Sequence, residues 1–155
     1  MDGGDWVAAV LVTLAGLATV AAFAVMHYEG LSRLDRWRFG AATTSRPRDV
    51  VVAVLGLTVL HLVQIVGWGV LFWVAVQWPE AGVIDAERAV GLLEAIYVSG
   101  LNYSTLGLGG GLEPAGPVRV LVVMESLVGL MMIAWSANFT FRHLSVQLGH
   151  GRDGH

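Results

Sequence analysis

The sequence contains no cysteine, which excludes disulfide scaffolds, thiol catalysis and zinc sites built from cysteine. It also contains no lysine, so all nine basic residues are arginine. Charged residues make up only 14% of the 155 residues, and the net charge of −3 argues against a nucleic-acid partner. A soluble domain carries about 25% charged residues. With 55% hydrophobic residues and a mean hydropathy of +0.67, the chain is typical of an integral membrane protein.

Three apolar stretches are long enough to cross a bilayer as helices, namely Trp6–Met26, Val50–Trp78 and Val120–Phe141. Crossing takes about 20 residues, because lipid offers the backbone no hydrogen-bond partners and a helix satisfies its own. A fourth stretch, Ala89–Leu101, is too short to cross and favours a re-entrant half-helix. The predicted fold class is therefore an all-α membrane protein with three transmembrane helices plus this half-helix. The first span lacks the basic flank of a signal peptide, so we expect it to be a retained helix.

The arginines predict the orientation, because positive residues stay on the cytoplasmic side. Most of them follow the first or the third span: Arg33, Arg36, Arg38, Arg46, Arg48, Arg142 and Arg152. The other two, Arg88 and Arg119, lie on the opposite side. We therefore expect a multi-pass protein of the cell's inner (plasma) membrane, with its N-terminus outside and its C-terminus in the cytoplasm.

A glycine-alternating segment follows the half-helix and reads Ser-Thr-Leu-Gly-Leu-Gly-Gly from Ser104 to Gly110. Glycine clusters usually mark flexible turns, and a phosphate-binding loop would need a preceding strand and, in the Walker form, a lysine. Alternating glycine permits backbone angles that aim successive carbonyl oxygens to one side. A ring of such carbonyls can replace the hydration shell of a monovalent cation.

This arrangement resembles the pore of the potassium-channel family, which has an outer helix, a pore half-helix, a T-V-G-Y-G-D filter and an inner helix with a hinge glycine. The filter residues that the resemblance implies are Thr105, Leu106, Gly107, Leu108 and Gly109. Gly129 lies at the spacing expected of the hinge glycine, and Arg119 matches a basic residue at the outer end of the inner helix. Ser99 and Tyr97 match pore-helix positions, with Tyr97 where an aromatic often lies behind the filter. The resemblance covers roughly residues 50–141.

The resemblance implies a channel rather than an enzyme, with no cofactor other than permeant potassium ions. The chain has one T-x-G-x-G segment, so a homotetramer in the lipid bilayer must bring the filter strands together. Residues 1–49 would form an N-terminal transmembrane helix and an Arg-rich cytoplasmic linker, residues 50–142 the pore domain, and residues 143–155 a cytoplasmic tail. Leu108 replaces the usual aromatic residue and Gly110 the usual aspartate, which leaves a weakly selective monovalent cation channel as the alternative.

Several polar residues interrupt the apolar spans. His61 and Gln64 share one helix face, which Trp68 continues, and we expect hydrogen bonds between helices there. Glu125 is expected to be buried against the half-helix or a neighbouring subunit. Glu94 is expected either to supply negative charge at the outer mouth or to anchor the half-helix.

Two other functions remain open. A haem-binding membrane electron carrier would use His27 and His61 as axial ligands. Counting along the spans places these two histidines at different depths, and haem binding leaves the glycine loop unexplained. A non-conducting assembly subunit with the same fold is the other possibility, which flux measurements would separate.

Overall fold

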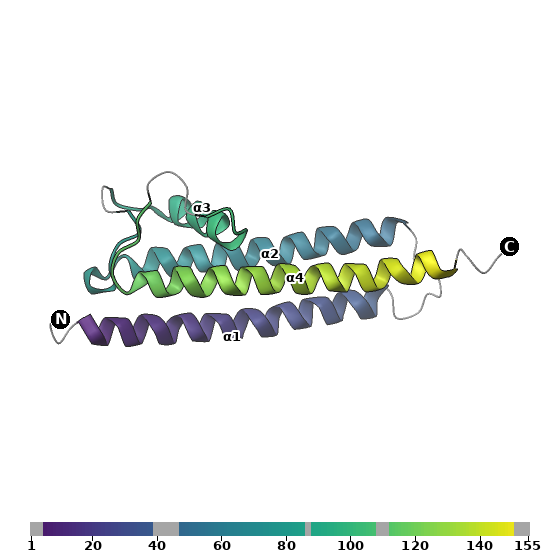
Figure 1. The fold of residues 1–155 in the computed structure, drawn as a ribbon, viewed down its shortest axis with the longest axis horizontal. Coiled ribbons are helices and arrows are strands. Elements are labelled where there is room, and N and C mark those ends of the chain that lie inside the picture. Colours follow the sequence, from purple (N-terminus) through teal and green to yellow (C-terminus); the bar gives the residue numbers. More distant parts are fainter. Residues whose placement is uncertain (1–4, 39–46, 86–87, 108–111, 151–155) are drawn as a thin grey trace. The chain divides into compact units, whose positions relative to one another are not determined.

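The computed structural model describes residues 5–38, 47–85, 88–107 and 112–150 (Figure 1). Its elements are, in chain order, α1 (Asp5–Arg38), α2 (Pro47–Ala75), the short 3-10 helix η1 (Pro79–Ala81), α3 (Leu92–Tyr103) and α4 (Val118–His150). Over these described ranges no strand is present, and the one β-type contact is an antiparallel bridge between Val83 and Ala115. The expectation of an all-α protein is confirmed.

Three helices are long and apolar enough to cross a membrane, over Trp6–Trp37, Arg48–Ala75 and Val118–Arg142. This confirms the prediction that the chain is a multi-pass membrane protein. The first and third helices extend well past the predicted ends, because the polar residues that follow the apolar runs continue the helix. The second ends at Ala75, short of the predicted Trp78.

The early end of α2 has a local cause. Trp78 precedes Pro79, whose ring disfavours the helical conformation for the residue before it. Trp78 accordingly has extended angles, with φ −103° and ψ 110°. The chain turns away through η1 instead of continuing the helix.

The chain forms two compact units, and all three long helices contribute to both. Unit 1 comprises Met1–Phe23 and Val63–Leu130, and unit 2 comprises Ala24–Leu62 and Met131–His155. Each unit is described by itself below.

Small residues let the helices of unit 1 approach closely. A Cβ atom added at Gly16 of α1 would lie 2.8 Å from the Leu121 side chain of α4. One added at Gly69 of α2 would lie 2.6 Å from the Cα atom of Ile96 in α3. Such contacts are typical of membrane helices, where close van der Waals packing replaces the hydrophobic effect as the driving force between helices. Glycine therefore determines how near α3 can come to α2.

The short helix α3 has 12 residues, from Leu92 to Tyr103. At about 1.5 Å per residue it is about 18 Å long, well short of the hydrocarbon core of about 30 Å. A short helix is therefore present where the half-helix Ala89–Leu101 is predicted, with its limits moved toward the C-terminus. It begins after Gly91, which has extended angles and provides no side-chain cap.

In unit 2, α1 runs antiparallel to α2. Gly30 of α1 faces Leu60 of α2, and the earlier α2 residue Gly56 faces the later α1 residue Leu34. Among the described residues of this unit, the buried side chains are apolar apart from His27, Ser136 and Asp49, and His27 has no exposed surface.

Candidate functional site

Buried polar side chains gather where α3 meets α2 and α4 in unit 1. Glu125 of α4 has no exposed surface. Its Oε2 atom accepts a hydrogen bond from Asn102 Nδ2 at 2.7 Å, and its Oε1 atom contacts the Ser99 hydroxyl. Ser99 Oγ also donates to the carbonyl oxygen of Ile65 in α2, at 2.8 Å. The expectation that Glu125 is buried against the half-helix is confirmed.

A hydrogen count favours a neutral Glu125 carboxyl. A serine hydroxyl holds one hydrogen and cannot donate to both Ile65 and Glu125. All contacts are satisfied when Glu125 is protonated and donates to Ser99 Oγ, while its other oxygen accepts from Asn102. A neutral carboxyl also suits a fully buried position, because burying an unpaired charge is very costly.

Asn102 and Tyr103 extend this network to both neighbouring helices. Asn102 Nδ2 also donates to the Val122 carbonyl at 2.8 Å, and its Oδ1 accepts from Ser126 Oγ at 2.6 Å. The Tyr103 hydroxyl donates to Gln64 Oε1 of α2. Burial raises the pKa of Tyr103 well above its usual range, so the phenol keeps the hydrogen that it donates.

These side chains form the polar cluster of α3, which consists of Gln64, Ser99, Asn102, Tyr103, Glu125 and Ser126. The cluster ties the C-terminal half of the short helix to α2 on one side and to α4 on the other. The expectation that Gln64 makes a hydrogen bond between helices is confirmed. The same expectation holds for His61, which contacts Ser136 of α4 at 3.0 Å.

Gly129 lies against the last turn of α3. A Cβ atom there would lie 2.5 Å from the Tyr103 carbonyl oxygen and 3.1 Å from its Cα atom. The missing side chain therefore allows α4 to touch the backbone of α3. Hinge bending at Gly129 stays a prediction beside this packing role.

Left-handed backbone angles begin directly after α3. Thr105 has φ 61° and Gly107 has φ 83°, and Leu106 between them is 77% exposed. In the described ranges Thr105 is the one non-glycine residue with a positive φ. Such an angle costs a side-chain-bearing residue about 1–2 kcal/mol. At Thr105 it also ends α3, since a left-handed residue after the last turn is a common helix C-terminal cap. Left-handed angles at every second residue can aim successive carbonyls to the same side.

The remaining predicted filter residues, Leu108 and Gly109, lie outside the described residues, as does Gly110. The described part of the loop is tied to α3 by backbone hydrogen bonds. Thr105 N donates to Asn102 O, and Leu106 N donates to Leu101 O, both at 3.1 Å. The polar cluster and the loop therefore share one short segment of chain.

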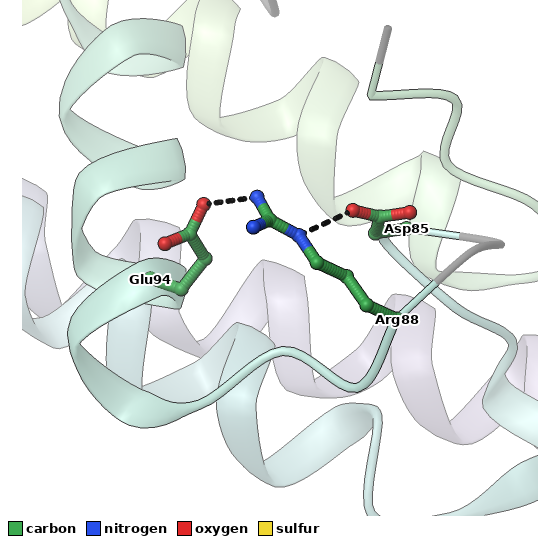
Figure 2. Close-up of polar contacts among 3 residues, drawn as sticks. All are labelled: Asp85, Arg88 and Glu94. Atoms are coloured by element: carbon green, nitrogen blue, oxygen red, sulfur yellow. Dashed lines mark hydrogen bonds and ion pairs between the residues drawn. The ribbon is translucent and has the colours of Figure 1, made fainter.

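An arginine clamp holds the other end of α3 (Figure 2). The guanidinium of Arg88 donates to Asp85 Oδ2 at 2.9 Å and to Glu94 Oε1 at 3.0 Å. Arg88 is 65% exposed, and exposed ion pairs contribute about 0–1 kcal/mol each. Of the two roles expected for Glu94, the structure provides the contact that anchors the helix.

Two expectations from the sequence meet a different geometry. The different depths inferred for His27 and His61 are wrong, because their ring centroids lie 5.4 Å apart and the Ser136 hydroxyl contacts both rings. Counting along each span missed the tilt and register that bring the two histidines together. Tyr97, the aromatic residue expected behind the filter, is 60% exposed in the single chain, whereas Tyr103 is buried.

Asn102, Tyr103 and Ser126 were not singled out from the sequence, although a signal for them exists. Ser99, Asn102 and Tyr103 are spaced three and four residues apart, which places them on one face of an otherwise apolar helix. Polar residues on one face of a membrane helix turn toward protein partners rather than lipid.

No protein-family model, curated protein or solved structure matches the chain.

Proposed function

We propose that the chain is the subunit of a homotetrameric, potassium-preferring cation channel. Ions would pass along a fourfold axis lined by the backbone carbonyls of the filter, which consists of Thr105, Leu106, Gly107, Leu108 and Gly109. The observation that carries the proposal is the pair of left-handed residues, Thr105 and Gly107, at the end of a helix too short to span a membrane.

The short helix α3 supports this function as a re-entrant pore helix. Its C-terminal end, which carries the negative end of the helix dipole, precedes the loop directly and would stabilise a cation that has lost part of its water shell. Backbone that is not helical is tolerated at membrane depth only where protein or water surrounds it. The polar cluster of α3 supplies protein partners for this purpose, since it joins α3 to both neighbouring helices.

The orientation completes the proposal. With the N-terminus outside and the Arg-rich segment between α1 and α2 in the cytoplasm, the loop after α3 faces the outside. Both α2 and α4 then have their far ends on the cytoplasmic side, as a pore of this kind requires. The membrane is the inner (plasma) membrane of the cell, and the permeant ions need no cofactor.

Selectivity is the second part of the proposal. Leu108 can pack but cannot donate a hydrogen bond, and Gly110 has no carboxylate to accept one. An outer filter built from these residues lacks the polar contacts that would hold its diameter constant. We therefore propose that potassium is preferred and sodium is incompletely excluded, with a weakly selective monovalent cation channel as the alternative.

The test is ion flux into liposomes that contain the purified protein. We expect potassium to pass fastest, sodium more slowly and a large organic cation least. Absence of flux for all monovalent cations would contradict the channel and favour a non-conducting assembly subunit.

A glycine variant makes the test specific for the loop. Gly107 has φ 83°, and an added Cβ would touch nothing within 4 Å, so Gly107→Ala perturbs the backbone angle without a clash. A left-handed alanine costs about 1–2 kcal/mol, which corresponds to a flux about tenfold lower if the carbonyls turn away. Gly91→Ala is the matched control, because Gly91 has φ −76° and equally open surroundings. Equal flux in both variants would contradict a filter at this loop.

A further inference from the structure

An antiparallel backbone bridge follows the loop that contains the proposed filter. Val83, in the segment before α3, donates its N–H to the Ala115 carbonyl at 3.0 Å, and Ala115 donates back to the Val83 carbonyl at 2.9 Å. This mutual exchange is the hydrogen-bonded pair of an antiparallel ladder. Ala115 lies between the predicted filter and α4 in the chain. The bridge therefore joins the segment that leads into α3 to the segment that leaves the filter.

Two glycines allow the two segments to meet. Gly82 has φ 99° and ψ −162°, a combination that is essentially restricted to glycine. A Cβ atom there would lie 2.0 Å from the Ala115 carbonyl oxygen, which is an acceptor in the bridge. Gly116 has φ 82°, and a Cβ atom added to it would lie 2.9 Å from the Cα atom of Gly82. Alanine at either position must therefore push the two segments apart.

Buried residues and α4 hold the bridge in place. Ala81 and Ile84, in the segment before α3, have no exposed surface, and neither has Val118 at the start of α4. In the other segment, the carbonyl of Gly116 accepts a hydrogen bond from the N–H of Arg119 at 3.2 Å. The bridge is therefore anchored in the core of unit 1 and joined to the first turn of α4.

The filter loop is thereby attached at both of its ends. At its start, the N–H groups of Thr105 and Leu106 donate to carbonyls of α3. At its end the bridge fixes Ala115, and residues 107–114 lie between the two attachments. Fixing both ends of a short loop limits the conformations that its backbone can adopt. This restraint acts through the backbone and needs no side chain on the filter.

We propose that the bridge between Val83 and Ala115 limits widening of the outer filter, and that Gly82 and Gly116 are positioning residues for ion selectivity. The proposal rests on the proposed function, because it gives the bridge a role in choosing between ions. Selectivity between potassium and sodium depends on the size or the field strength of the carbonyl cage. A cage whose outer end is released from the bridge therefore admits sodium more readily.

Hydrogen exchange tests the bridge without reference to ion flow. Val83 and Ala115 are exposed residues, so hydrogen bonding in the bridge is what slows exchange of their amides with solvent. We expect both amides to exchange slowly in the unmodified protein and much faster in the bridge variants, Gly82→Ala and Gly116→Ala. Fast exchange in the unmodified protein, or slow exchange that survives in both variants, would overturn the proposal.

Gly91→Ala is the matched control for both bridge variants. Gly91 lies in the same segment before α3, has φ −76°, and an added Cβ would meet nothing within 4 Å. We expect this variant to keep the amide protection and the ion preference of the unmodified protein. Gly116→Ala, which has the smaller overlap, is the variant to measure if Gly82→Ala does not fold.

Reversal potentials in potassium and sodium test the role in selectivity. We expect both bridge variants to raise the permeability of sodium relative to potassium severalfold, with the larger change in Gly82→Ala. The readout is a ratio, so a variant that only assembles in lower yield lowers the current without changing it. Bridge variants that lose amide protection and keep the permeability ratio would overturn the proposal while the channel stands. If the unmodified chain passes no monovalent cation, the channel fails and the role in selectivity fails with it.

Discussion

Glu125 illustrates how a single acidic residue can be accommodated within an apolar helix. Its carboxyl faces two polar side chains of α3, Ser99 and Asn102, rather than a cation. When Ser99 donates to Ile65, the hydrogen count gives this carboxyl one donor and one acceptor, which is the pattern of a neutral acid. The residue therefore positions α3, and a contact with permeant ions is not needed to explain it.

Substitutions at Glu125 distinguish a neutral acid from a charged one. Glu125→Gln preserves one donor for Ser99 and one acceptor for Asn102, so we expect the free energy of unfolding in detergent to change by less than about 0.5 kcal/mol. Glu125→Leu removes the partner of one Asn102 amide hydrogen and one contact of the Ser99 hydroxyl, and should lower it by about 2 kcal/mol, with loss of flux. If Glu125→Gln lowered the free energy of unfolding as much as Glu125→Leu, the result would show that Glu125 is charged in the folded protein.

Gly129 can be tested in the same way. A Cβ atom at this position would lie 2.5 Å from the Tyr103 carbonyl oxygen, so Gly129→Ala must move α4 away from α3. We expect a loss of about 1–3 kcal/mol in the stability of the folded assembly, measured by denaturation in detergent, whereas Gly91→Ala should change little. If Gly129 acts as a hinge instead, the same variant keeps its stability and its ion preference, and only the open probability changes.

At the scale of the element, the short helix α3 depends on contacts with the rest of the protein for its stability and its position. It has 12 residues and no side-chain cap at its N-terminus. Isolated helices of about 12 residues are marginal even with favourable sequences. The helix is held at its start by the exposed Arg88 clamp and at its end by the polar cluster, and these two attachments differ in burial.

We expect the two attachments of α3 to contribute unequally. Arg88→Gln removes two ion pairs of an exposed arginine and should lower the free energy of unfolding by at most about 2 kcal/mol in all, an effect that salt reduces. Asn102→Leu removes three hydrogen bonds from a residue that is 5% exposed, and should cost about 2 kcal/mol or more with little dependence on salt. Denaturation at low and high salt measures both. A larger loss for Arg88→Gln than for Asn102→Leu would mean that the arginine clamp stabilises α3 more than the polar cluster does.

At the scale of the whole molecule, the proposed pore requires copies of the chain around an axis, with the loop after α3 nearest to it. Leu106 lies in this loop and is 77% exposed in the single chain, which leaves room for a label. Since the chain contains no cysteine, a single introduced cysteine provides a unique labelling position.

Distances between spin labels test the fourfold axis. With a label on Leu106→Cys, we expect two short distances whose ratio is about 1.4, the diagonal and side of a square. A label on Val10→Cys, an exposed position of α1, should give the same ratio at longer distances. A single distance, or loop labels farther apart than the α1 labels, would contradict a filter on the axis.

The fold could largely be predicted from the sequence, because its determinants are local. The apolar runs, the short length of the half-helix and the Pro79 that follows α2 each act within a few residues. The left-handed angles at Gly107 are also a local property of glycine. The assignment of Leu108 and Gly109 to the filter rests on the sequence alone, since these residues lie outside the described ones.

Tertiary structure decided which polar residues meet. That Glu125 reaches Ser99 and Asn102 depends on the rotation of α4 about its axis, and composition carries no record of that rotation. The meeting of His27 with His61 depends on the register of α1 against α2, which is why counting along the spans put them at different depths. Hydropathy along the chain determines which segments enter the membrane, whereas the close packing of side chains determines how those segments are turned toward one another.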